Sequence, residues 1–121
     1  MSRYGDRFLA ETYAKDEPVG AGLSSEVIAD THEYGLWIPE RLFHRIQNLA
    51  RAYELHLLPA LEPYGKNELT HSQAETLVDE LSFIGDLISD ELLAGYIGRL
   101  IELAEKCIRS ARQVRLVIEG P

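Results

Sequence analysis

The sequence predicts a mainly α-helical fold, a three-helix antiparallel bundle with a small β element that pairs a C-terminal strand with an N-terminal segment. Two patterns favour it: apolar residues recur at helical spacing over three long stretches, and the last residues change to a period of two. The chain has 121 residues, enough to bury a core without a metal or a disulfide. We therefore expect residues 1–121 to form a single domain.

The first third of the chain carries the weakest signals. Residues 7–14 (RFLAETYA) and 25–35 (SEVIADTHEYG) each fit a strand or a short helix, and the sequence leaves both open. The segment between them, residues 14–25, contains one proline and two glycines and predicts a loop. Residues 36–38 (Leu-Trp-Ile) favour an extended segment, and we expect Trp37 to lie in the core.

A first helix is predicted at residues 39–58. Pro39 suits a first helical turn, because proline lacks the N–H that is unsatisfied there in any case. The apolar residues then recur every three or four positions, and Pro59 ends the pattern.

A second helix is predicted at residues 73–88. Ser72 is followed three residues later by Glu75, a spacing typical of a capping box. The residues that share its apolar face are Leu77, Leu81, Ile84 and Ile88.

A third helix is predicted at residues 90–112, with Ser89 and Asp90 as cap candidates. Its apolar positions form a heptad seam, which places this helix centrally. The seam consists of Leu93, Ile97, Leu100, Ala104, Cys107 and Ala111.

A strand is predicted at residues 113–118, where apolar side chains alternate. A lone strand leaves its backbone N–H and C=O groups unsatisfied, so it requires a partner. We expect the partner to be residues 7–14 or 35–38 of the same chain, in preference to a second molecule, because closing a long loop adds only a modest entropy cost.

Charge and cysteine content narrow the classes of partner and compartment. There are 12 Lys and Arg against 20 Asp and Glu, for a net charge of −8, which disfavours nucleic acid and favours basic partners. The one cysteine, Cys107, is expected to be a small core residue. The sequence shows no signal-peptide pattern and no membrane-spanning run, so a cytoplasmic location is expected.

Residues 36–54, an extended segment feeding a helix, resemble the opening of ribbon-helix-helix repressors. Such folds read DNA with polar or basic strand residues, whereas residues 36–38 are apolar and the chain is acidic. We expect no nucleic-acid partner.

The candidate functional site is an acidic surface in the middle of the chain. Residues 67–98 contain no Lys or Arg, and a step of about 100° per residue places Glu75, Asp79 and Asp86 on one helix face. We expect this surface to dock on a basic partner, with a tyrosine as an apolar anchor. The candidate partner-binding residues are Glu75, Asp79, Glu80, Asp86, Asp90, Glu91, Tyr64 and Tyr96.

Neither a metal site nor a catalytic set is predicted, and no cofactor is expected. Only one Glu-x-x-His spacing occurs, Glu68 with His71, whereas a di-iron bundle needs two such pairs. Asp30, His32 and Glu33 form an isolated polar cluster. His44 is expected on the polar face of its helix, and no serine lies in a nucleophile context.

Taken as a class, small acidic chains without a catalytic set are similar to bacterial immunity proteins and antitoxins. That similarity implies a non-enzymatic inhibitor that occupies a basic site, such as the cleft of a nuclease toxin. Two alternatives remain: a self-associating assembly module, in which the terminal strand pairs across a homodimer, and an enzyme with carboxylate chemistry. The enzyme alternative requires two of the acids to converge in a pocket with His44 or His71.

Overall fold

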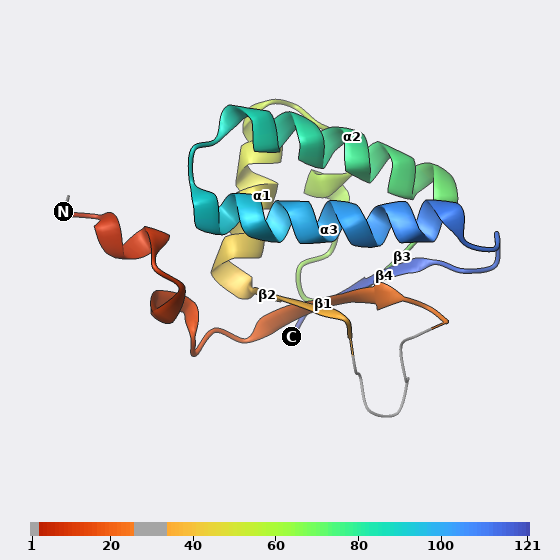
Figure 1. Ribbon diagram of the computed structural model, residues 1–121, viewed down its shortest axis with the longest axis horizontal. Coiled ribbons are helices and arrows are strands. Elements are labelled where there is room, and N and C mark those ends of the chain that lie inside the picture. The colour runs from red at the N-terminus through yellow and green to blue at the C-terminus, as the bar shows by residue number, and fades with distance from the viewer. Residues whose placement is uncertain (1–2, 26–33) are drawn as a thin grey trace.

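The computed structural model describes residues 3–25 and 34–121 (Figure 1). In these ranges the long helices are α1 (Glu40–Ala52), α2 (His71–Leu87) and α3 (Glu91–Arg109). Three short 3-10 helices are η1 (Gly5–Phe8), η2 (Ala10–Tyr13) and η3 (Leu58–Ala60). The strands are β1 (Pro18–Leu23), β2 (Leu36–Pro39), β3 (Lys66–Leu69) and β4 (Leu116–Glu119).

The four strands form one antiparallel sheet in the order β2-β1-β4-β3. The strand predicted at the C-terminus is therefore confirmed as β4, and it pairs within the chain. Its neighbours differ from those expected: β1 lies in the stretch predicted to be a loop, and residues 7–14 contribute to the 3-10 helices instead.

The wrong loop prediction for β1 has a simple cause. Val19, Ala21 and Leu23 alternate toward the core and are at most 5% exposed. Gly20 and Gly22 stand between them, and glycine ordinarily marks turns. In this strand Gly20 permits close approach, because a Cβ there would lie 2.5 Å from Cδ2 of Tyr34.

The helices are stacked on one face of the sheet, as Figure 1 shows. α3 packs on β1, β2 and β4, and α2 pairs with α3 on the side away from most of the sheet. α1 runs across α2 and α3 in this view rather than alongside them. The three predicted helices are present, but the fold is a mixed α/β arrangement with a four-stranded sheet, not a mainly α three-helix bundle.

The heptad seam of α3 forms the centre of the core. Leu93, Ile97, Leu100, Ala104 and Cys107 are all at most 2% exposed. The last seam position, Ala111, lies beyond the end of α3 and is exposed. The core prediction for Cys107 is confirmed, and burial raises the pKa of its thiol. Each fully buried Leu or Ile contributes about 1.5–3 kcal/mol, so this face accounts for much of the stability.

α1 ends at Ala52, earlier than the predicted 58. The backbone N–H of Leu55 donates to the carbonyl of Ala50 at 2.9 Å, and that of Glu54 donates to the carbonyl of Arg51 at 3.1 Å. This is a Schellman ending, in which one residue takes a left-handed conformation. That residue is Glu54, with φ of 57°. Glycine usually marks such an ending, so the sequence showed no stop signal here.

α2 begins two residues earlier than predicted and uses different capping residues. The Thr70 hydroxyl accepts the N–H of Gln73, and the Gln73 side chain accepts the N–H of Thr70. The capping box expected from Ser72 and Glu75 is therefore wrong, although the same physical device starts the helix.

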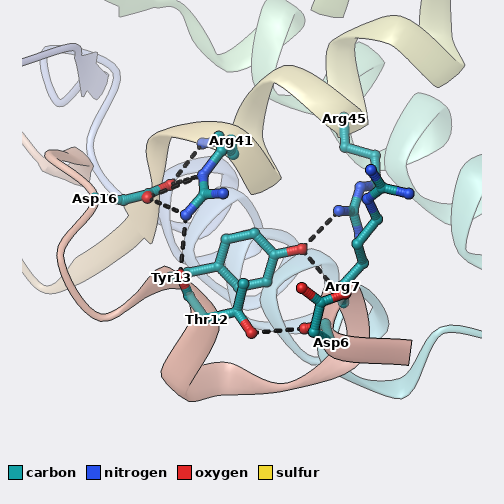
Figure 2. A network of polar contacts seen from close by, with 7 residues as sticks. All are labelled: Asp6, Arg7, Thr12, Tyr13, Asp16, Arg41 and Arg45. Carbon is teal, nitrogen blue, oxygen red and sulfur yellow. Dashed lines mark hydrogen bonds and ion pairs between the residues drawn. The ribbon is translucent and has the colours of Figure 1, made fainter. Parts of the chain in front are cut away.

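The N-terminal 3-10 helices are fastened to α1 by two arginines (Figure 2). Arg41 holds the carboxylate of Asp16 through its guanidinium, at 2.7 and 3.0 Å, and through its backbone N–H, at 3.1 Å. Arg45 donates to the hydroxyl of Tyr13 at 2.6 Å, and that hydroxyl donates to the carbonyl of Arg7. Tyr13 is only 4% exposed, so the network anchors a buried ring.

Candidate partner-binding surface

The exposed face of α2 carries three carboxylates. Glu75, Asp79 and Asp86 are all exposed, as the helical spacing predicts. Within residues 3–25 and 34–121 none of the three forms a hydrogen bond or an ion pair. Glu75 and Asp79 are one turn apart, so their like charges repel. Glu75 also lines a groove with Arg112 and Arg115, which offset part of its charge.

Glu80 is not on that face. It is 7% exposed, and its carboxylate accepts the backbone N–H groups of His56, Leu57 and Leu58 at 3.1, 2.8 and 2.9 Å. These groups belong to the segment that follows the early end of α1. The expectation that Glu80 joins the acidic docking surface is therefore wrong, because its buried carboxylate stabilises the turn at residues 56–58.

Asp90 is also used internally. Its side chain accepts the N–H of Leu93 at 3.2 Å as the N-cap of α3, which confirms the predicted cap. It also pairs with Arg45 at 3.2 Å, and its side chain is 10% exposed. The expectation of an uncompensated charge at Asp90 is wrong, because the pairing arginine comes from α1, 45 residues earlier.

The remaining candidates lie in different settings. Glu91 is exposed in the first turn of α3. Tyr64 is 62% exposed, its ring stands edge-on to His44, and its hydroxyl donates to Glu40 at 2.7 Å. That hydrogen bond raises the pKa of Tyr64. Tyr96 is half-buried against the core, with the Arg99 guanidinium 4.9 Å from its ring centre.

The structure adds an aromatic pair that the sequence prediction missed. Tyr53 and Phe83 are 51% and 42% exposed, and their rings meet edge-to-face with centroids 5.5 Å apart. Phe83 follows Asp79 by four residues and precedes Asp86 by three, so it lies between them on the surface of α2. Leu87, 48% exposed, is one turn further along.

Tyr53 lies within the helix predicted at residues 39–58, and its spacing from Leu49 would place it on the apolar face of that helix. Because α1 ends at Ala52, Tyr53 caps the helix and turns outward. For Phe83 a signal existed: it falls outside the Leu77/Leu81/Ile84 stripe, so an aromatic ring on the outer side of α2 was visible in the spacing. Trp37, expected in the core, is likewise 45% exposed.

The described residues contain no group of three His, Cys, Asp or Glu side chains arranged to hold a metal ion. The cluster of Asp30, His32 and Glu33 lies outside the described residues. His44, expected on a polar face, is half-buried, and its Nε2 atom has no hydrogen-bond partner in the part of the chain that the structure describes.

The enzyme alternative requires two of the candidate acids in one pocket with His44 or His71, and the groove that contains His71 has only one of them. A polar groove of about 610 Å³ at the start of α2 is lined by His71 and Glu75, together with Arg112 and Arg115. Among the candidate acids in the described ranges, Glu75 alone lines it. This groove therefore does not bring two carboxylates together beside a histidine.

Within the described ranges, no helix has the length and apolar character needed to cross a bilayer. A scan against protein-family models and searches of curated proteins and of solved structures each returned no significant match. The geometry and charge of the chain itself are therefore the basis for inferring its function.

Proposed function

We propose that this protein is a non-enzymatic binding module that docks on a basic protein surface through the exposed face of α2, in the manner of an immunity protein or antitoxin. The observation that carries the proposal is the solvent-exposed ring of Phe83, paired with Tyr53 and placed between the carboxylates of Asp79 and Asp86. We define these four residues together with Glu75 as the α2 surface.

The two kinds of side chain on the α2 surface have complementary roles. Exposed aromatic rings that become buried supply most of the affinity in protein interfaces, because they bring a large rigid area at little entropy cost. Carboxylates around such an anchor steer a cationic partner and raise the association rate. The net charge of −8 extends the same field over the whole molecule.

The like-charge repulsion on α2 supports the same proposal. Glu75 and Asp79 at a separation of four residues cost the free protein a few tenths of a kcal/mol. A partner that brings arginine or lysine removes this cost on binding. We therefore propose a partner with a basic rim around an apolar pocket, and a nuclease toxin has a basic cleft of this kind.

The experiment starts by capturing partners on the immobilised protein and on the double charge reversal Asp79→Lys with Asp86→Lys. A captured protein is then purified, and its association rate is measured as a function of salt concentration. We expect a steep fall of the rate with salt and a loss of at least about tenfold in the reversed variant.

A matched reversal of Glu102 and Glu105, both exposed on α3, supplies the control. It changes net charge equally but leaves the α2 surface intact, so its effect should stay within about threefold. Phe83→Ala should raise the dissociation rate instead. Equal effects of the two reversals would count against the α2 surface, and inhibition of a nuclease partner in a cleavage assay would support the immunity-type function.

In the alternative of a self-associating module, the terminal strand was expected to pair across a homodimer. β4 has β1 on one side and β3 on the other, so no free backbone edge of β4 is left to pair across a dimer. Among the described strands the sheet edges are β2 and β3, and β2 ends at Pro39. Light scattering on the full chain would separate a monomeric module from a dimer formed through another surface.

A further inference from the structure

A second candidate site is a pocket beside the junction of α2 and α3. Its volume is about 540 Å³, within the range of about 300–1,000 Å³ that is typical of small-molecule sites. Three parts of the chain supply its walls: η1, α1 and the segment that joins α2 to α3. It includes none of the five residues of the α2 surface, so a ligand here does not depend on the proposed docking function.

Most of the pocket wall is apolar. The apolar side chains that line it are Phe8, Leu49, Leu87, Ile88 and Leu93. Phe8 and Leu87 are 56% and 48% exposed, so two large apolar side chains of the wall remain in contact with water. Covering such a surface with an aliphatic chain removes apolar area from water on both sides and favours binding.

The charged side chains of the pocket differ in how far they are already paired. Asp90 caps α3 and pairs with Arg45 at 3.2 Å, so these two charges offset each other. Arg7, labelled with Arg45 in Figure 2, places its guanidinium 4.4 Å from the ring centre of Tyr4. Within the described residues this guanidinium forms no hydrogen bond and no ion pair. Arg7 is therefore available to pair with an anionic ligand.

We propose that this pocket binds an unbranched aliphatic carboxylate, that is, a free fatty acid. The aliphatic chain covers the apolar wall, and the carboxylate pairs with Arg7, whose planar guanidinium donates two parallel hydrogen bonds to such a group. The net charge of −8 repels anions from the molecule as a whole and attracts cations. A preference for an anionic over a cationic amphiphile is therefore a specific sign of Arg7.

The test titrates the full-length, isotope-labelled protein with sodium octanoate, octanol and octylammonium chloride at matched ionic strength, and follows the backbone amide shifts. We expect octanoate to give saturable shifts at residues 87–90 in the millimolar range. Octanol and octylammonium should bind at least about fivefold more weakly, since neither pairs with a guanidinium. Decanoate should bind about tenfold more tightly than octanoate, because it buries two more methylene groups.

Two variants and a matched control localise the binding. Arg7→Gln should weaken octanoate about fivefold and leave octanol unchanged. Leu87→Asn removes part of the exposed apolar wall and should weaken both ligands about threefold. Arg112→Gln removes an equal charge from an exposed residue beyond the other end of α3, and should leave octanoate binding within about twofold.

The proposal is supported if octanoate saturates at residues 87–90, is preferred over octylammonium, and loses that preference in Arg7→Gln but not in Arg112→Gln. It is overturned if octanoate does not saturate, if octylammonium binds as tightly, or if the two arginine variants behave alike. Equal binding of octanol and octanoate also overturns it, because the pocket would then be an apolar contact without a role for Arg7.

Discussion

The inner and outer faces of α2 carry neighbouring carboxylates with opposite roles. Glu80 is buried and accepts three backbone N–H groups from residues 56–58, whereas Asp79 is exposed and has no hydrogen bond or ion pair within the described residues. The two residues are adjacent in the sequence and have similar chemistry. The difference shows that an acidic residue on a helix has no fixed role until the surrounding backbone is in place.

The same contrast recurs at the start of α3, where Asp90 and Glu91 are adjacent. Asp90 caps the helix and pairs with Arg45, whereas Glu91 is exposed. The acidic character of this protein therefore has two components. One part stabilises turns and helix ends, and the other part is exposed to solvent.

The largest expected effect is that of Glu80→Ala. Three N–H groups lose their acceptor in a buried setting, so the free energy of unfolding should fall by about 3 kcal/mol. Asp79→Ala is the matched control and should change it by less than about 0.5 kcal/mol. Urea denaturation of both variants measures the difference, and equal midpoints would show that Glu80 has no structural role.

Asp90→Ala should have an intermediate effect. It removes both the N-cap of α3 and the partner of Arg45, and should lower the free energy of unfolding by about 1.5 kcal/mol. Glu91→Ala, one residue further on, should cost only a few tenths of a kcal/mol through the helix dipole. Thermal unfolding of the two variants measures the difference. If Glu91→Ala were the more destabilising, the different roles assigned to Asp90 and Glu91 would be refuted.

A smaller effect, dependent on pH, is expected at Asp16. The side-chain hydrogen bond from Arg41 holds the pKa of Asp16 below its usual value of 3.8. A lowered pKa in the folded state means that the ionised form stabilises the fold above the unfolded pKa, and that this contribution is lost as the pH falls through the folded value. Asp16→Asn should cost less than about 1 kcal/mol at pH 7, because the pair is close to solvent.

The difference between wild type and Asp16→Asn should therefore shrink as the pH is lowered from about 5 to about 2. Urea denaturation at several pH values measures it. A difference that stayed constant over this range would mean that the Asp16–Arg41 pair does not contribute through its charge.

The smallest expected effect has the opposite sign. Asp79→Asn removes the repulsion from Glu75 one turn earlier, and should raise the free energy of unfolding by a few tenths of a kcal/mol. The gain should disappear in 1 M salt, where the Debye length is about 3 Å. Stabilisation of the free protein combined with weaker partner binding would mark Asp79 as a residue retained for docking.

The helices and the terminal strand could be predicted because their signals are local. The spacing of Leu77, Leu81 and Ile84, and the alternation around Val117, depend only on neighbouring residues. The early end of α1 was not predictable in this way, since Glu54 occupies a left-handed position that glycine usually marks. β1 was missed for the converse reason, because its glycines resembled a loop.

By itself, the sequence determined three helices, a C-terminal strand that needed a partner, and a run of carboxylates without nearby cations. Those features follow from side-chain period and charge, which are properties of a short stretch of chain. Only the tertiary structure decided which carboxylates remain outside. The backbone N–H groups that hold Glu80 and the guanidinium that holds Asp90 come from segments more than twenty residues away. Contacts between such distant segments exist only once the chain has folded, so periodicity cannot reveal them.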